Sequence, residues 1–223
     1  MSGTGRSKVF ERTEGMLSTP VALNRIEVVV IGTSAGGVAA LKQIVARLPG
    51  DFPVPIIIAQ HCAAQKPDLL AAVLRATSKL RVKEAENGEQ LWPGCIYLAP
   101  AARHVAIEQF GYISVRNGDK IRYSRPSIDL LFSSAAETYR DRILGIVLTG
   151  ANADGALGVC TIDLLGGIVI AQQGAEYPQM PTAAVATGAV HHELPLETLC
   201  SAMIALCMLP GAARWMQRFT GLN

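Results

Sequence analysis

The sequence predicts an α/β protein with a three-layer, doubly wound fold, in which a mainly parallel sheet carries an antiparallel hairpin excursion. Short β-branched runs without polar alternation recur along the chain, as in strands buried on both faces. Segments with helical spacing separate most of these runs, as in βαβ units. Near the middle, several short runs instead follow one another across Gly-containing turns, as in hairpins.

The first βαβ unit begins where the sequence becomes apolar at Ile26. Residues 26–31 form a Val-rich strand, and residues 54–59 form a second β-branched strand. Between them, apolar residues spaced by three and four predict one buried helical face, which comprises Val38, Leu41, Val45 and Leu48. Pro49-Gly50 ends this helix. Because such crossovers are right-handed and place the helix on one sheet face, we expect the two strands to be parallel.

The middle of the chain predicts the antiparallel excursion. A second helix begins near Pro67 and buries Leu70, Val73 and Leu74. Short strands follow at residues 95–99, 105–109, 112–116 and 121–123. Phe110-Gly111 and Asn117-Gly118 separate the last three and are typical of hairpin turns.

Alternation of helices and strands resumes in the second half. The predicted elements are a helix around Ile128–Ala135, a strand at 143–149, a helix from Gly155, a strand at 168–172, a short helix at 181–187 and a final helix from Pro195 to about Met208. The segments IIIAQ (56–60) and IVIAQ (168–172) echo each other, but no fixed period indicates a repeat protein.

Length and composition indicate one domain with short extensions. The chain has 223 residues, of which half are hydrophobic and 17% are charged, against about 25% charged in typical globular proteins. Residues 1–25 have no apolar period and predict a disordered tail. We therefore expect a domain over residues 26–210 and a C-terminal extension over 211–223.

Charge and cysteine content exclude several classes of function. The net charge of +2 is too small to indicate a nucleic-acid partner. No apolar stretch is as long as a membrane span, and the N-terminal residues are too polar for a secretion signal. The five cysteines include no C-x-x-C pair, so we expect neither a disulfide framework nor a thiolate zinc site. These features predict a cytoplasmic protein without a metal.

The loop after the first strand carries the strongest motif. Residues 32–37 read Gly-Thr-Ser-Ala-Gly-Gly, which fits G-x-S-x-G between a strand and a helix. Such a turn exposes a serine hydroxyl, here that of Ser34, in a strained conformation. Two other readings stay open: Ser34 caps the helix, or the loop binds a dinucleotide phosphate. The dinucleotide-binding interpretation lacks two features of that motif. Ser34 stands where the middle glycine would be, and Gln60-His61 stand where the acidic residue that binds the ribose would be.

A base and an acid follow other strands at the same sheet edge. His61 comes directly after the second strand and can act as a base, although a strand-end histidine often just binds a backbone carbonyl. Asp154 lies in the loop after residues 143–149 and can orient an imidazole, although aspartate before a helix is also the usual N-cap. Asp129 is the second acid, and we expect it in the first turn of its helix. His104 and the pair His191-His192 are expected at the surface.

These residues lie in a chain that resembles the catalytic domain of the chemotaxis protein-glutamate methylesterases of the CheB type. The matching stretches are VVVIGTSAGGVAAL (28–41), IIIAQH (56–61), GEQLWPGCIYLAP (88–100) with His104 after it, RPSIDLLFSSAA (125–136), GIVLTGANADGALG (145–158), IAQ (170–172) and MPTAAV (180–185). The resemblance assigns the family's nucleophile, base and acid to Ser34, His61 and Asp154.

The resemblance also implies a reaction and its partners. The family hydrolyses glutamate methyl esters on the cytoplasmic helices of chemoreceptors, releasing methanol, and some members deamidate receptor glutamine, without a cofactor. The backbone N–H of Ala35 and an N–H near Gly150-Ala151 are the candidates for an oxyanion hole. A non-catalytic module that binds receptor helices or a signalling partner is the alternative function.

Two departures from the family pattern stand out. Ala35 replaces a frequent threonine, and Thr149-Gly150-Ala151-Asn152 replaces Thr-Gly-Met-Gly. Both changes affect the expected substrate fit and oxyanion geometry.

The family's receiver domain precedes the catalytic domain, and the residues before the first strand are too few to form one. We therefore expect a stand-alone catalytic domain, with any regulation coming from a separate receiver or signalling protein.

Overall fold

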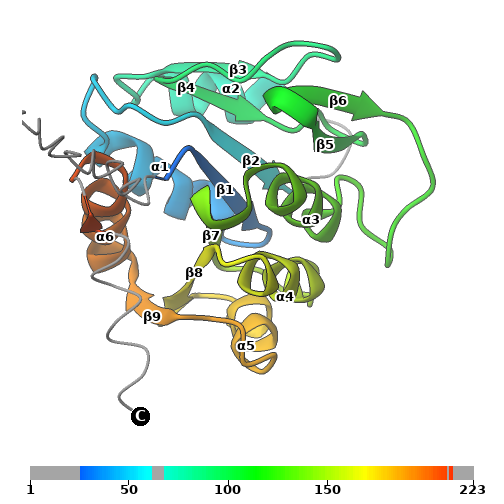
Figure 1. Cartoon of the computed structure of the whole chain (residues 1–223), viewed down its shortest axis with the longest axis vertical. Coiled ribbons are helices and arrows are strands. Elements are labelled where there is room, and N and C mark those ends of the chain that lie inside the picture. The colour runs from blue at the N-terminus through cyan, green and yellow to red at the C-terminus, as the bar shows by residue number, and fades with distance from the viewer. Residues whose placement is uncertain (1–25, 62–67, 210, 213–223) are drawn as a thin grey trace, which may run out of the picture.

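The computed structural model describes residues 26–61, 68–209 and 211–212. They form a seven-stranded sheet in the order β3-β4-β2-β1-β7-β8-β9, with all its pairs parallel, and a separate two-stranded sheet of β5 and β6 (Figure 1). The predicted tail at 1–25, most of the predicted extension and the predicted helix start near Pro67 lie outside the described residues.

The element bounds show how closely the strands follow the apolar runs. The strands are β1 (Val28–Thr33), β2 (Ile56–Gln60), β3 (Arg81–Glu84), β4 (Cys95–Leu98), β5 (His104–Glu108), β6 (Tyr112–Arg116), β7 (Ile143–Val147), β8 (Ile168–Gln173) and β9 (His192–Pro195). The helices are α1 (Gly37–Arg47), α2 (Asp68–Arg75), α3 (Ile128–Tyr139), α4 (Ala156–Leu164), α5 (Gln179–Val185) and α6 (Leu196–Met208), with 3₁₀ turns at Gln109–Gly111 and Arg140–Arg142.

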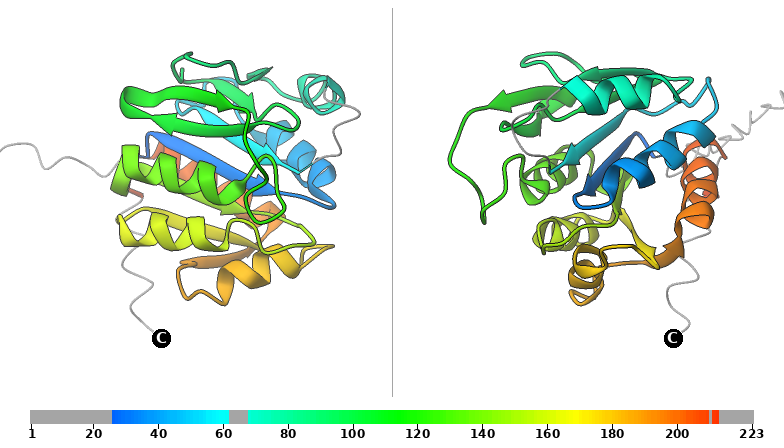
Figure 2. Two further views of the ribbon diagram at one scale, coloured as in Figure 1. Left: turned by 90° about the vertical axis from the view of Figure 1, so that its right-hand side faces the viewer. Right: turned by 180° about the vertical axis from the view of Figure 1, so that it is seen from behind.

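Helices cover both faces of the large sheet. Alternate residues of β1 belong to different cores: Val29 and Ile31 face α1, α2 and α6, whereas Val28 and Val30 face α3, α4 and α5. The two helical layers lie on opposite sides of the sheet in both views of Figure 2. The three-layer α/β class predicted from the sequence is therefore confirmed.

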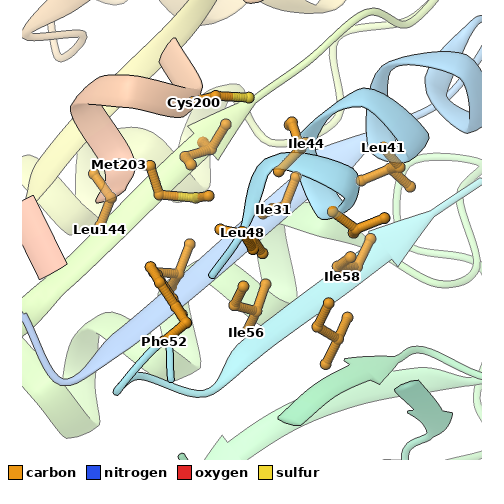
Figure 3. Packing of buried hydrophobic residues seen from close by; sticks show 14 of the residues in the cluster. Ile31, Leu41, Ile44, Leu48, Phe52, Ile56, Ile58, Leu144, Cys200 and Met203 are labelled. Carbon is orange, nitrogen blue, oxygen red and sulfur yellow. The ribbon is translucent and has the colours of Figure 1, made fainter. Parts of the chain in front are cut away.

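The core under α1 and α6 is built of close-packed aliphatic side chains. Figure 3 shows Ile31, Ile58 and Leu144 from the strands packing with α1 and α6. Phe52 and the partners from the two helical segments are all 1% exposed or less. Those partners are Leu41, Ile44, Leu48, Cys200 and Met203. Burying one such aliphatic side chain contributes about 1.5–3 kcal/mol, so this layer holds the central strands in place.

The order in which the chain adds strands to the sheet reverses at β1. From β1 the chain moves to β2 and β4 on one side, and it later returns to β7 on the other side. The helix after β1, α1, covers one face, and the helix after β7, α4, covers the other. Because the two following loops diverge, a crevice is expected at the carboxyl ends of β1 and β7.

Several elements differ from the prediction. Residues 95–98 are a parallel strand of the main sheet, and β5 and β6 form their own antiparallel sheet. Residues 121–123 are not a strand, since only an isolated bridge joins Ile121 and Ser124 around Arg122 and Tyr123, which have positive φ. The edge strands β3 and β9 were not predicted. Their sequences, RVKE and HELP, lack the apolar signal of strands buried on both faces.

The buried face of α1 is narrower than predicted at its start. Val38 is 43% exposed, while Ala40, Leu41, Ile44 and Val45 are buried.

None of the helices among residues 26–61, 68–209 and 211–212 has both the length and the apolar character of a membrane span.

Candidate active site

The loops after β1, β2 and β7 meet at the carboxyl edge of the sheet. Parallel pairing sets Thr33 beside Gln60, so the next residues, Ser34 and His61, leave adjacent strands at the same level. The His61 N–H donates to the carbonyl of Thr33 over 3.0 Å. The Ser34 N–H donates to the carbonyl of Thr149, in the loop after β7, over 3.0 Å. The three loops are therefore tied together through their backbones.

The turn at Ser34 depends on glycines beside it. Gly36 has φ of 74°, which suits glycine, and a Cβ at Gly32 would collide with Ile128 of α3. Ser34 is not among the described residues with positive φ, so the prediction of a strained serine backbone is wrong. The residue of this turn in the left-handed region is Gly36. The capping alternative is also wrong, because the N-cap of α1 is Gly36 and has no side-chain cap.

Two glutamines support these loops, buried Gln60 and half-buried Gln172, and neither role was predicted from the sequence. Gln60 donates from Nε2 to the carbonyls of Ser34 (2.8 Å) and His61 (2.7 Å). Gln172 accepts the Thr149 N–H at its Oε1 over 2.9 Å. Both glutamines end the echoed IIIAQ and IVIAQ segments. That echo was the available signal for a shared supporting role.

His61 and Asp154 form a close pair. His61 Nε2 lies 2.8 Å from Asp154 Oδ2, and the two side chains are 14% and 2% exposed. The same carboxylate accepts the backbone N–H groups of Ile128 (2.8 Å) and Asp129 (3.1 Å) at the N-terminus of α3. Burial alone would raise the pKa of Asp154, but the hydrogen bonds from His61 and the two N–H groups outweigh it and lower the pKa. The carboxylate is thereby held ionised beside the imidazole.

Asp129 belongs to α3, but its carboxylate accepts N–H groups at the N-terminus of α4, as that of Asp154 does at the N-terminus of α3. Its Oδ1 accepts the N–H groups of Leu157 (3.0 Å) and Gly158 (2.9 Å). Burial, reinforced by the nearby charge of Asp154, raises the pKa of Asp129. The N-cap of α4 is Gly155, so Asp154 does not cap the helix that follows it. We call Asp129 and Asp154 the crossed carboxylates, because each accepts N–H groups from the helix of the other's segment.

The nucleophile and the base are not joined in this structure. Within the described part of the chain, no hydrogen bond connects Ser34 Oγ with His61. The second ring nitrogen of His61, Nδ1, instead lies 3.2 Å from Asn152 Nδ2. Catalytic hydrogen bonds are often longer or absent without substrate, so this geometry leaves Ser34 as a candidate nucleophile.

The candidate oxyanion donors divide into two groups. The Gly150 N–H donates to the Tyr177 carbonyl over 2.9 Å and is therefore engaged. Within residues 26–61, 68–209 and 211–212, the N–H groups of Ala35 and Ala151 have no protein partner. These two N–H groups remain able to bind a developing negative charge.

Two of the other three histidines, His104 and His191, bind backbone groups. His104 is 4% exposed, against the expected surface position; its Nδ1 accepts the Ser127 N–H (3.2 Å) and its Nε2 donates to the Asp119 carbonyl (2.9 Å). His191 accepts the Val169 N–H at Nδ1 over 3.2 Å, and His192 lies in β9, not in a loop. In the described ranges, no three His, Cys, Asp or Glu side chains gather as a metal site would need.

Comparison with known proteins places this geometry in a family. The family model described as CheB methylesterase matches residues 29–203. A Leptospira interrogans protein, named as a candidate protein-glutamate methylesterase/protein-glutamine glutaminase, is 40% identical over 182 residues, covering 81% of this chain and 94% of that protein. A Moorella thermoacetica protein-glutamate methylesterase/protein-glutamine glutaminase is 42% identical over 188 residues, but the match covers only 44% of its length.

A solved structure agrees with both. The crystal structure of the Thermotoga maritima CheB methylesterase catalytic domain superposes with a TM-score of 0.78 at 35% identity, covering 81% of this chain and 98% of that one. The match to the family model spans β1 to α6 and so includes all three loops at the carboxyl edge of the sheet. The chain therefore belongs to the CheB methylesterase family.

Proposed function

We propose that this chain hydrolyses methyl esters of glutamate side chains on the cytoplasmic helices of chemoreceptors, with Ser34 as nucleophile, His61 as base and Asp154 as the acid that orients the base. The observation that carries the proposal is the His61–Asp154 pair, 2.8 Å apart, beside the loop of Ser34. The names of the relatives, which give both methylesterase and glutaminase activity, support the substrate class.

Acylation begins at the serine hydroxyl. Ser34 Oγ attacks the ester carbonyl carbon while His61 Nδ1 takes the hydroxyl proton. The carbonyl oxygen becomes an oxyanion that accepts hydrogen bonds from the Ala35 and Ala151 N–H groups, and losing one such donor typically costs about 3 kcal/mol of barrier. The bond to the methoxy oxygen then breaks, and His61 returns the proton so that methanol leaves. Ser34 is left esterified to the glutamate side chain.

Water completes the cycle by the same route. It attacks the acyl-enzyme carbonyl as His61 Nδ1 takes one of its protons, and that proton then passes to Ser34 Oγ as the bond to Ser34 breaks. The glutamic acid side chain that is released then loses its remaining proton to solvent. A glutamine substrate differs only in its leaving group, since the amide nitrogen takes the proton from His61 in place of the methoxy oxygen and leaves as ammonia. No step needs a metal or an organic cofactor.

Asp154 matters because the imidazole becomes charged in every step. Its pKa is lowered, so it is ionised when His61 holds the extra proton, and its Oδ2 accepts from Nε2. The N–H groups of Ile128 and Asp129 fix the carboxylate in place. The ring is thereby oriented with Nδ1 available for proton transfer.

Methanol release tests the proposal. Purified protein is added to membranes that carry methylated chemoreceptor, and we expect the Ser34→Ala variant to release no methanol above background. Ser201→Ala, an exposed serine of α6, is the matched control and should behave as wild type. Wild-type turnover by Ser34→Ala would exclude the mechanism. Failure of a fluorophosphonate to label Ser34, with receptor binding retained, would instead favour the non-catalytic binding module.

A further inference from the structure

Asn152 contacts both the base and the acid of the candidate site. It lies in the loop between β7 and α4 and its side chain is exposed. Its Nδ2 is 3.2 Å from His61 Nδ1, and its Oδ1 accepts the backbone N–H of Asp154 over 3.2 Å. In the sequence, this position stands out only as a departure from the family pattern.

These contacts fix the direction of each hydrogen bond. The Asn152 Oδ1 must accept from the Asp154 N–H, so its Nδ2 is the end that faces His61. An amide nitrogen only donates, and Nδ1 must therefore be the unprotonated ring nitrogen. The ring proton then sits on Nε2, where Asp154 Oδ2 accepts it over 2.8 Å.

The same contact competes with the nucleophile. Neutral imidazole has one lone pair in the ring plane at Nδ1, and it can accept one well-aligned hydrogen bond. The Asn152 amide occupies that lone pair in this structure, and Ser34 Oγ needs it for proton transfer. The two donors cannot both be well placed at once.

We propose that Asn152 is a latch on the catalytic base: its amide occupies His61 Nδ1 in the resting enzyme, and Ser34 displaces it when the reaction begins. The inference rests on the proposed roles of Ser34 and His61. A second acceptor lowers the cost of release, because Ser124 Oγ lies 3.5 Å from the same Nδ2. The amide can thus leave Nδ1 and still keep a partner on the turn that carries Arg122 and Tyr123.

The rate of Ser34 labelling by a fluorophosphonate tests the latch without a receptor substrate. A neutral hydrogen bond of this kind is worth roughly a 2- to 10-fold change in rate, so Asn152→Ala should be labelled faster than wild type by about that factor. Asn87→Ala, another exposed asparagine that accepts one backbone N–H, is the matched control and should be labelled at the wild-type rate. Slower or unchanged labelling of Asn152→Ala overturns the latch.

A second variant separates a latch from simple support of the loop. Asn152→Asp keeps the shape and the oxygen that accepts the Asp154 N–H, but a carboxylate oxygen facing Nδ1 attracts a proton to that nitrogen. We expect labelling slower than wild type, opposite in sign to Asn152→Ala. A supporting role would slow both variants, and that result would overturn the proposal.

The ring nitrogens of His61 give a readout that does not depend on activity. Long-range ¹H–¹⁵N correlation spectra should show wild-type His61 as the Nε2–H tautomer, with the Nδ1 resonance shifted in Asn152→Ala and unchanged in Ser34→Ala. A shift in Ser34→Ala alone would show that Ser34 holds Nδ1 and would overturn the latch. Methanol release that survives Ser34→Ala would refute the proposed function, whereas the spectra still decide which residue holds Nδ1.

Discussion

The N-termini of α3 and α4 look alike but carry different chemistry. Each donates N–H groups to a buried carboxylate from outside the helix: α3 to Asp154 and α4 to Asp129, which are 5% and 7% exposed. Each carboxylate binds two backbone N–H groups. Yet the pKa of Asp154 is lowered and the pKa of Asp129 is raised.

The difference lies in what else each carboxylate touches. Asp154 also accepts from His61, whereas Asp129 Oδ2 is buried without a partner in the part of the chain that the structure describes. A helix N-terminus therefore does not by itself offset the cost of burying a charge. The hydrogen bond from the imidazole accounts for the opposite directions of the two pKa shifts, and so we assign the chemical role to Asp154 and the structural role to Asp129.

Substituting each carboxylate by its amide gives the largest expected contrast. Asp154→Asn should lower the rate of methanol release by about 10⁴-fold, because an amide does not stabilise the imidazolium or select its tautomer. Asp129→Asn should lower it less than about 10-fold, since it touches neither His61 nor Ser34. Equal losses in the two variants would contradict the division of roles. The assay uses methylated receptor, with folding of both variants checked by circular dichroism.

Stability should respond to Asp129 through its hydrogen bonds, not its charge. Asp129→Ala leaves the N–H groups of Leu157 and Gly158 without their acceptor and should lower the free energy of unfolding by about 1–3 kcal/mol. Asp129→Asn keeps an acceptor oxygen and removes the buried charge, so it should lose much less at pH 7. Urea unfolding measures both variants, and a larger loss for the asparagine variant would reverse the interpretation.

The pH dependence of stability should have opposite signs at the two sites. The lowered pKa of Asp154 means that its contribution is present above its ordinary value of 3.8 and is lost as pH falls through the lowered value. The raised pKa of Asp129 means that its contribution is present below 3.8 and is lost as pH rises through the raised value. Relative to its own asparagine variant, wild type should gain stability with rising pH at Asp154 and lose it at Asp129. Urea unfolding between pH 3 and pH 7 gives both differences, and differences of the same sign would contradict the pKa directions.

The sequence predicts the central strands well and the periphery poorly. Residues of β1, β2, β7 and β8 are buried on both faces, so their apolar runs are unambiguous. The edge strand β9 pairs on one side only and contains Pro195, which masks its strand character. The hairpin of β5 and β6 is local and predictable, but its separation from the main sheet depends on long-range packing.

At the candidate site, strand ends were predictable and side-chain partners were not. Ser34, His61 and Asp154 each follow a buried strand, so the topology brings their loops to one edge. The contact of Asn152 with Nδ1 depends on the path of a loop, which sequence spacing does not determine. The same is true of the exchange of carboxylates between α3 and α4, where the alternative considered for Asp154, capping of its own helix, is not what the structure has.

Because of the crossed carboxylates, we expect that α3 and α4 can be transferred between homologous proteins only together. Each helix begins on an acid supplied by the other's segment, and Gly158 packs against Phe132 so closely that a Cβ would collide. A chimera that takes α3 from one relative and α4 from another has to rebuild both of these contacts at once. Grafts with boundaries before Ser127 and after Leu164 keep both acids with their own helices, and recombination between relatives is expected to respect the same boundaries.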